Sequence, residues 1–401
     1  MPLDTILQEQ DTAGLKSSHP SFFILIALIG GLAIFSSTLS KTPVLPLFAL
    51  ALHATPSEIG WIVMASTIPG ILISFPAGAL SDFLGRRRLL LAALLVFATA
   101  PFLYLIVSNA WQLMAVRFYH GFATAIFGTV ASAAIAARYT TDRAAKLSTY
   151  SSITIIGRSL APFLGGFLIS LASFHAVYIA CAISGVLALA AGLLLRDAAP
   201  TAAAAKLEMP HFWVSLTTVL RDRRIMLVSM VEAAQYLVFG AIEAFLALFA
   251  ASLGMPAWQI GVMLGVQLVS IVFAKPLMGK VSDRVGRKHV IIPGLLIGAA
   301  SIVLLPHAPS FIGLTVLSLA FGLGFATVTS STAALVADLT QDNRYGSSMG
   351  VLRTVMDVGQ SIGPVLTGWM VGYAGYGSAF TLLAAILLTA ALMLGLMFRE
   401  D

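Results

Sequence analysis

Long apolar stretches recur along nearly the whole chain, each separated from the next by a short charged or Pro/Gly-rich segment. A helix needs about 20 apolar residues to cross the hydrocarbon core of a bilayer, and these stretches reach that length. The pattern therefore predicts twelve membrane-spanning helices. The predicted spans are 22–50, 57–80, 88–107, 111–136, 146–171, 174–195, 225–251, 256–279, 289–306, 309–336, 346–371 and 376–398.

The amino-acid composition leads to the same conclusion. Of the 401 residues, 59% are hydrophobic and only 10% are charged, so water cannot be the solvent for most of the surface. Residues 1–21 carry charges but no apolar core, so we expect no cleavable signal peptide. Cys181 is the single cysteine, which excludes an internal disulfide framework and a cysteine-based metal cluster, and no metal site is predicted.

The basic residues predict the orientation. Five of the 23 Lys and Arg lie inside predicted spans, and the others lie at helix ends or in loops that share one side of the membrane if both termini do. By the positive-inside rule, that side is cytoplasmic. We therefore expect a multi-pass protein of a bacterial-type inner cell membrane, with both termini cytoplasmic. The net charge of +6 reflects this topology, so the expected partners are the lipid bilayer and a small-molecule substrate, and no nucleic acid.

Three sequence elements occur twice, in the same order and with nearly the same spacing. The pairs are 78–88 with 279–288, 121–124 with 324–327, and 157–166 with 359–368, which are offset by 201, 203 and 202 residues. Two parallel repeats of six helices, related by an axis along the membrane normal, explain this periodicity. The predicted organisation is an N-terminal six-helix bundle in 1–195 after a short cytoplasmic tail in 1–21, a cytoplasmic linker in 196–223, and a C-terminal six-helix bundle in 224–401.

These motifs resemble those of the major facilitator superfamily, in particular its twelve-helix, proton-coupled drug and metabolite efflux branch. The loop 78–88 is similar to the family pattern G-x-L-x-D-R-x-G-R-R, with Phe83 in place of the Arg that directly follows the Asp of that pattern. The run 117–121 is similar to R-x-x-Q-G, with His120 in place of Gln. The resemblance implies an all-α integral membrane protein with the major facilitator fold, in which 12 transmembrane helices form two pseudo-symmetric six-helix bundles, and it implies a monomer.

In the resembling family the loop after helix two acts as a conformational latch, because its Asp meets the start of helix eleven, where free N–H groups and the helix dipole favour an anion. The resemblance carries this role to Asp82, while Gly78 and Gly85 should supply close packing or unusual backbone angles. Arg86 to Arg88 can instead be plain topology anchors. The predicted latch residues of the two repeats are Gly78, Asp82, Gly85, Arg86, Gly279, Asp283, Gly286 and Arg287.

Helices five and eleven each contain a proline beside glycines. Residues 157–166 resemble the family's antiporter pattern G-x-x-x-G-P-x-x-G-G, with Ala161 in place of Gly. Proline removes a backbone hydrogen bond and bends its helix, and glycine lets another helix approach closely. A role in helix bending and gating and a pure packing role are equally consistent with this pattern. The residues concerned are Gly157, Pro162, Gly363 and Pro364.

Ionisable residues at bilayer depth are costly unless they face a cavity or a partner, so they are the main functional candidates. The shared scaffold does not require three of them, because the other repeat has uncharged residues at the equivalent positions. A proton carrier has to be a carboxylate, since an arginine does not release its proton at neutral pH. The resemblance implies that Arg117 acts on such a carboxylate. The candidates for the substrate and proton pathway are Lys41, Arg117, Arg158, Glu232, Glu243 and Lys275.

Two ion pairs are predicted among the intramembrane charges. Thr42 aligns with Glu243 at the offset of 201, so Lys41 and Glu243 are expected to meet across the central cavity, in its outer half. The alternative is two separate side chains that extend to the membrane surface. Arg353 and Asp357 are four residues apart on one helical face, which predicts a structural ion pair within the helix.

The function expected from these features is secondary active transport, as proton-coupled export of a small organic compound or drug by alternating access. No phosphate-binding motif of the type G-x-x-x-x-G-K-[ST] is present, so the proton gradient is the expected energy source, and neither a cofactor nor a catalytic residue is predicted. The basic interior and the lack of Asp or Glu in span 22–50 favour an alternative on the same fold, an organic-anion or metabolite importer or exchanger. A non-transporting membrane sensor or enzyme is a third interpretation.

Overall fold

The computed structural model describes residues 19–73, 85–139, 141–195, 217, 219–340 and 345–398, and these residues fold almost entirely as helices. Eleven helical stretches among them are long and apolar enough to cross a membrane. The last stretch is long enough for two crossings, and it breaks at Gly375, whose φ of 77° and ψ of 176° are not helical. The prediction of twelve membrane helices is confirmed.

The helices fall into two groups, called here the N-half (described residues 19–195) and the C-half (described residues 219–398). The N-half contains α2 (His19–Leu39), α3 (Val44–Ala51), α4 (Pro56–Ala65), α6 (Arg86–Tyr104), α7 (Ala110–Arg138), α8 (Arg143–Leu171) and α9 (Phe174–Leu193). The C-half contains α11 (Arg223–Ser252), α12 (Ala257–Val285), α13 (Arg287–Leu304), the short 3₁₀ helix η1 (Leu305–His307), α14 (Phe311–Leu339) and α15 (Tyr345–Met397). Most of the predicted linker 196–223 lies outside the described residues.

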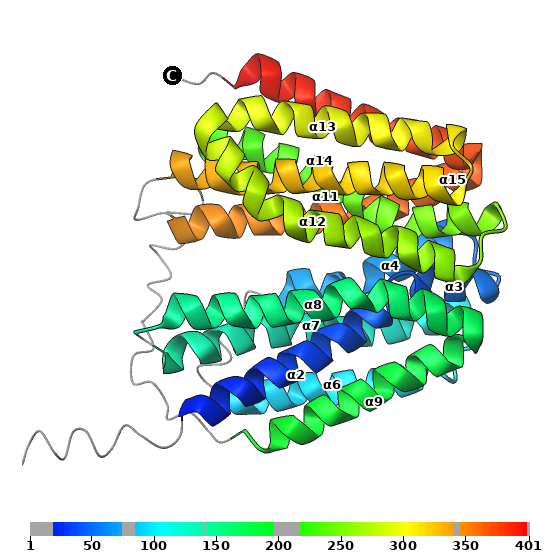
Figure 1. The fold of residues 1–401 in the computed structure, drawn as a ribbon, viewed down its shortest axis with the longest axis vertical. Helices are drawn as coiled ribbons and strands as arrows, with labels where there is room; N and C mark the ends of the chain where they lie inside the picture. Colours follow the sequence, from blue (N-terminus) through cyan, green and yellow to red (C-terminus); the bar gives the residue numbers. More distant parts are fainter. Residues whose placement is uncertain are drawn as a thin grey trace, which may run out of the picture.

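Figure 1 shows the N-half below the C-half, with the start of α2 and the end of α15 on the same side of the molecule. We call this side the terminal side and the opposite one the far side. The two halves approach each other at the far side, around α3 and α4 (Figure 1). One buried apolar cluster there contains residues of both halves, among them Phe48 and Ile59 from the N-half and Phe245 and Leu248 from the C-half. Burial of this shared apolar surface holds the far side closed.

Direct backbone contact joins α8 to α12 within this far-side interface. A Cβ added at Gly166 would lie 2.4 Å from the carbonyl oxygen of Ala257 and 2.8 Å from the Cα of Gly261. The Oγ of Ser170 accepts a hydrogen bond of 2.9 Å from the backbone N–H of Trp258. Because glycine has no side chain, the two helices can pack backbone against backbone at this point.

The first predicted span is not one helix. The structure divides 22–50 into α2 and α3, and residues 40–43 between them form a turn. The cause is Pro43, which has no N–H to donate and disfavours the helical conformation of the residue before it. The interruption places Lys41 and Thr42 in non-helical backbone, where they face the interior of the protein.

Candidate functional site

A cavity of about 910 Å³ lies between the two halves. Its walls come from α2, α7 and α8 of the N-half and from α11, α12, α14 and α15 of the C-half. It reaches from the turn at Lys41 to residues near the terminal-side ends of α8 and α15, such as Ser148 and Arg353, which are exposed to solvent. The cavity is therefore closed by the interface at the far side and open toward the terminal side.

Seven of the eight charged residues predicted inside the membrane line this one cavity. They are Lys41, Arg117, Arg158, Glu243, Lys275, Arg353 and Asp357. Helices far apart in the sequence bring them together, so the structure converts a scattered set of candidates into a single site. Five of the seven are basic, which leaves the cavity with a positive charge.

The two walls of the cavity differ in chemistry. The N-half contributes nine hydroxyl groups, which belong to Ser37, Thr38, Ser66, Thr67, Thr124, Ser148, Ser151, Ser152 and Ser159. Among the described residues that line the cavity, the C-half contributes no serine or threonine. Beside its charged residues and Gln360 this wall is aromatic and aliphatic, with Tyr236, Phe239 and Phe325 packed against one another. A ligand in the cavity would thus meet hydroxyl groups on the N-half side, and an aromatic and aliphatic surface beside charged groups on the C-half side.

The ion pair predicted between Lys41 and Glu243 is confirmed. The Nζ of Lys41 donates to Oε2 of Glu243 at 2.8 Å, and the hydroxyl of Thr42 donates to Oε1 at 2.8 Å. The side chain of Lys41 is 28% exposed and that of Glu243 is 12% exposed, so both groups border the cavity but are shielded from bulk water. Because the partners belong to different halves, this pair fastens the halves together at the closed end of the cavity.

The second predicted pair is also present, and it lies within one helix. The Nε of Arg353 is 3.8 Å from Oδ2 of Asp357, one turn further along α15. The side chain of Arg353 is 75% exposed, so the pair is well solvated and contributes little to stability.

Arg117 and its neighbours form a buried polar group at the N-half wall. Its guanidinium donates to the hydroxyl of Ser66 at 2.7 Å and to that of Tyr104 at 3.4 Å. Tyr104 also shares a hydrogen bond of 3.3 Å with Nδ1 of His120, and its ring stacks on Tyr178. The predicted carboxylate neighbour of Arg117 is not found among the described residues, where its partners are hydroxyl groups.

The sequence matches a known protein family along nearly its whole length. The model of the Major Facilitator Superfamily matches residues 25–266 and 228–401, which together span nearly the whole chain. The chain belongs to the major facilitator superfamily. It is a transporter of that superfamily, as the motif resemblance predicted, and the fold prediction is confirmed with it.

Individual relatives of this superfamily transporter are distant but cover most of its length. An uncharacterised MFS-type transporter of Methanocaldococcus jannaschii is 23% identical over 84% of this chain and 88% of its own length. Multidrug resistance protein 1 of Bacillus subtilis is 24% identical over 87% of this chain and 90% of its own length. Among solved structures, the nucleoside transporter NupG has a TM-score of 0.82 at 14% identity, covering 95% of this chain and 100% of NupG, which shows a common fold.

A bacterial homologue of the human lysosomal transporter Spinster, in an inward-facing and unoccupied conformation, has a TM-score of 0.76 at 14% identity. The comparison covers 94% of this chain and 96% of that one. At this identity the likeness again concerns the fold alone.

Arg158 and Lys275 of this transporter differ from the other cavity cations. Neither forms an ion pair or a side-chain hydrogen bond with any residue in the described ranges. Arg158 is exposed within the cavity, on α8, and Lys275 lies opposite on α12, where its Nζ is 5.7 Å from the ring centroid of Phe325. Both predicted pathway residues therefore face the cavity without an ion-pair partner among the described residues.

Glu232, the remaining pathway candidate, does not line the cavity. It is 3% exposed in the interior of the C-half, where its Oε2 accepts a short hydrogen bond from the hydroxyl of Thr332 on α14. Thr332 was not predicted from the sequence, and neither were Ser66 and Tyr104, the partners of Arg117. Neutral polar residues are common in membrane helices, so no sequence signal distinguishes the few that contact a charge.

The predicted latch loop is only partly within the described residues, since Gly78 and Asp82 lie outside them. Gly85, which precedes α6, has a φ of 87°, so the prediction of an unusual backbone angle is confirmed there, and Gly286, which precedes α13, has a similar φ of 99°. Gly279 does not have such a backbone angle, because it lies inside α12, and nothing lies within 4 Å of a Cβ added there. Helix α12 simply continues six residues beyond the predicted end of its span, so no close contact requires a glycine there.

The charged residues of the C-half loop pair within their own half. Arg287 lies 2.5 Å from Oδ1 of Asp283 and donates from Nε to Oδ2 of Asp338 at 2.9 Å. These contacts join the ends of α12 and α14 to the start of α13. Arg86, the equivalent of Arg287 in the N-half, begins α6.

The residue after each of these arginines has a role that the sequence did not reveal. Arg87 donates to the carbonyl oxygens of Leu195 and Leu193 at the end of α9, at 2.5 and 3.1 Å. Lys288, at the offset of 201, donates to those of Gly395 and Phe398 at the end of α15, at 2.9 and 2.7 Å. Each cation satisfies carbonyl groups that a helix end leaves unpaired. The repeat itself was the signal that could have identified this pair.

The proline and glycine residues of helices five and eleven have clear packing contacts. Gly157 lies against α2, where an added Cβ would be 3.3 Å from the Gly31 carbonyl oxygen, and at Gly363 it would be 2.0 Å from that of Leu237 on α11. Helices α8 and α15 continue through Pro162 and Pro364. The packing role is therefore observed, and the gating role stays a prediction.

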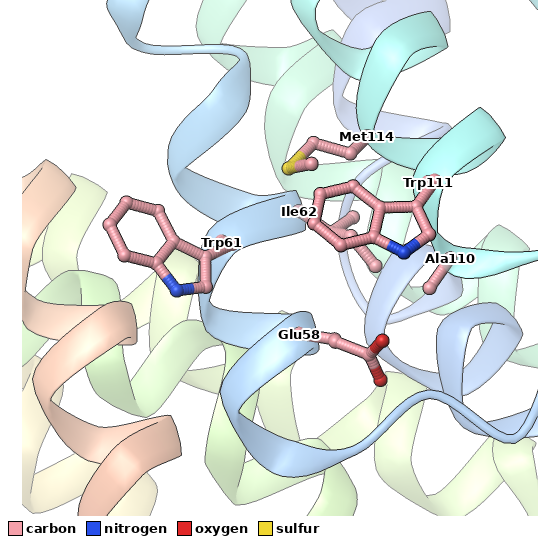
Figure 2. Close-up of a pocket in the computed structure, with 6 residues that line it drawn as sticks. All are labelled: Glu58, Trp61, Ile62, Ala110, Trp111 and Met114. Carbon is pink, nitrogen blue, oxygen red and sulfur yellow. The ribbon is translucent and has the colours of Figure 1, made fainter.

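A second, smaller pocket lies at the far-side ends of α4 and α7, and Figure 2 shows the side chains around it. It measures about 210 Å³, and apart from Glu58 its lining is apolar. The carboxylate of Glu58 already accepts hydrogen bonds from the backbone N–H and the hydroxyl of Thr55, which caps the start of α4. Trp61 and Trp111 are both exposed, as expected for tryptophans at a membrane surface.

Proposed function

We propose that this protein exports a small organic compound in exchange for protons, and that it does so by alternating access in a cell membrane with both termini cytoplasmic. On this orientation the cavity opens toward the cytoplasm, the side from which an exporter loads its substrate. Two distant relatives carry names that agree with export, Multidrug resistance protein 1 of Bacillus subtilis and the multi-drug resistance efflux pump PmrA of Streptococcus pneumoniae.

The observation that carries the proposal is the Lys41–Glu243 pair. It connects the two halves at the closed end of the cavity and is within reach of a ligand there. A buried ion pair is stable only while both partners are charged and together. A proton on Glu243 or an anionic group on Lys41 would each break the connection.

This geometry supports a route for proton exchange. While the far side is closed, Lys41 and Thr42 hold Glu243 as a charged carboxylate, so any proton that it carried is expelled toward the cytoplasm. A substrate that takes Lys41 from Glu243 releases the connection and favours opening of the far side. Glu243, now separated from Lys41 and exposed to the outside, takes up a proton as the substrate leaves. The return to the cytoplasm-facing state re-forms the pair and releases that proton.

Import or exchange of an organic anion or metabolite is the second candidate. The excess of basic residues in the cavity supports it, as does the absence of a carboxylate from α2 and α3. The two candidates differ in the direction of transport and in whether a proton gradient drives it.

Everted membrane vesicles test proton exchange directly. A pH gradient is established and followed with an acridine dye, and small organic compounds are then added, with chloramphenicol and aromatic carboxylates among them. We expect at least one compound to collapse the gradient only in vesicles that contain the protein. Flux that proceeds equally well without a gradient would contradict antiport.

The Lys41–Glu243 pair has its own test in a double-mutant cycle. Lys41→Ala and Glu243→Gln should each uncouple substrate flux from proton movement, and the double variant should lose little more than either single one, because both remove the same interaction. Arg353→Gln is the matched control, since its own pair with Asp357 is solvated and lies within one helix. Additive losses would show that Lys41 and Glu243 act separately.

A further inference from the structure

The cavity holds two opposed cations from different halves. Arg158 on α8 and Lys275 on α12 line this cavity from opposite halves, and both carry a positive charge. Their helices are in contact at Gly166 and Gly261, and from there they diverge toward the terminal side (Figure 1). Two like charges facing each other in a partly desolvated space oppose its closure. In the empty protein they therefore favour the open terminal side.

The nearby carboxylates do not neutralise these two cations. Glu243 lines the cavity, but its two oxygens are bound by Lys41 and Thr42, and Asp357 is paired with Arg353. Glu232 is buried in the interior of the C-half, where it is hydrogen-bonded to Thr332. Intramembrane charges usually find a partner. The partner missing from the described residues is an anion located between the two halves.

An aromatic surface lies directly beside Lys275. The ring of Phe325 is 4.4 Å from that of Phe239 and 5.1 Å from that of Tyr236, measured between centroids. Phe325 is also the ring over which the Nζ of Lys275 lies. A ligand whose anionic group reaches this lysine would therefore place the adjoining part of its body on aromatic side chains.

We propose that the substrate is an organic anion with an aromatic body, whose anionic group bridges Arg158 and Lys275 while the body lies against Tyr236, Phe239 and Phe325. The inference rests on the proposed function only in taking the central cavity as the transport site. The bound anion replaces repulsion between the halves by attraction to both, so it draws the terminal-side parts of α8 and α12 together. Substrate binding thereby closes the side through which the substrate entered.

The first experiment needs no ligand. A cysteine is introduced at Ser151, which lines the cavity on the terminal side, and its labelling by a membrane-impermeant maleimide is followed from that side. The native Cys181 is buried and gives little background. Arg158→Gln, which introduces the residue found at the equivalent position of the other repeat, should slow labelling because the repulsion is gone. Lys275→Gln should do the same, whereas Arg88→Gln, which removes an exposed cation outside the cavity lining, should not.

The second experiment uses matched aromatic compounds that differ only in charge. Naphthalene and biphenyl carboxylates are compared with their carboxamides and with the corresponding methylammonium compounds, by binding to the purified protein. The carboxylates should bind best and should slow labelling at Ser151→Cys. Arg158→Gln and Lys275→Gln should each weaken carboxylate binding about tenfold or more, as expected for loss of a charge-assisted hydrogen bond. Arg158→Lys should recover part of the affinity.

Anionic lipid headgroups offer the same chemistry, so the labelling is repeated in nanodiscs of phosphatidylcholine with and without phosphatidylglycerol. The proposal requires the free carboxylate to act in phosphatidylcholine alone. The proposal would be overturned if neither Arg158→Gln nor Lys275→Gln changed the labelling rate, or if the protein bound the carboxylates no better than the other compounds. Neither assay involves a proton gradient. Anion binding can therefore be confirmed even if proton exchange is refuted, and proton exchange can be confirmed even if anion binding is refuted.

Discussion

The two halves of this transporter have the same helical framework but present different surfaces to the cavity between them. The N-half wall is rich in hydroxyl groups and carries Lys41, Arg117 and Arg158, while the C-half wall is aromatic and aliphatic and carries Glu243 and Lys275. The equivalents of Arg117 and Arg158 in the C-half are Ala320 and Gln360. Positive charges at these positions are thus not required by the shared framework, and their asymmetry indicates a role in what the cavity binds.

Other features are the same in both halves, and they belong to the scaffold. Arg87 and Lys288 each satisfy the carbonyl groups at the end of the last helix of their half. Thr129 and Thr332, at the offset of 203, both donate to a carbonyl one turn earlier in their own helix. Only Thr332 also contacts a carboxylate, because Glu232 has Gly31 as its equivalent at the offset of 201. Comparing the repeats therefore separates residues that support the fold from residues that serve one half alone.

The largest effect is expected where the two halves touch. Gly166→Val should disrupt the far-side contact, because even a Cβ would lie 2.4 Å from the Ala257 carbonyl oxygen. Overpacking of this kind costs about 1–3 kcal/mol, which shifts the balance between the two access states about 5- to 150-fold. The shift is measured as faster labelling of Ser37→Cys by an impermeant maleimide applied from the far side, together with a loss of transport. Gly128→Val is the control, since nothing lies within 4 Å of a Cβ there, and equal behaviour of the two variants would refute the contact.

A smaller effect should separate the two equivalent threonines. Thr332→Val leaves Glu232 without its hydroxyl partner, and an unsatisfied buried polar group costs about 1–3 kcal/mol of folding free energy. Thr129→Val removes only a bond to the backbone of its own helix and should be nearly neutral. Thermal unfolding in detergent measures both, and Thr332→Ser should restore the stability. Equal losses at the two positions would mean that the contact with Glu232 contributes nothing.

The smallest effect is expected at the shared helix ends. Arg87→Ala should lower the free energy of unfolding by about 1 kcal/mol, the typical net value of a hydrogen bond, and leave substrate affinity unchanged. The exposed neighbour Arg88 provides the matched control in Arg88→Ala. A change in substrate affinity with unchanged stability would assign Arg87 to the transport cycle rather than to the scaffold.

Much of the fold could be predicted because the bilayer imposes strict requirements on sequence. Each crossing has to be long and apolar, so most span limits agreed with the helices in the part of the chain that the structure describes, and the break at Gly375 separated the last two spans near 371–376 as expected. The turn between α2 and α3 was missed, because hydropathy does not register the loss of a single backbone donor at Pro43. The extension of α12 past Gly279 was missed for a related reason, since a helix can continue into water beyond its apolar part.

The sequence by itself determined the twelve helices, their division into two repeats and the set of intramembrane charges, because these follow from local composition and from an offset along the chain. It also predicted the Lys41–Glu243 pair, since the symmetry of the repeats relates helices one and seven. Only the tertiary structure decided which charges have partners. Within the described residues it left Arg158 and Lys275 without ion-pair partners in the cavity, paired Arg117 with hydroxyl groups and buried Glu232 against Thr332. Those outcomes depend on angstrom-scale distances between side chains of different helices, and such distances are set by helix packing rather than by any pattern along the chain.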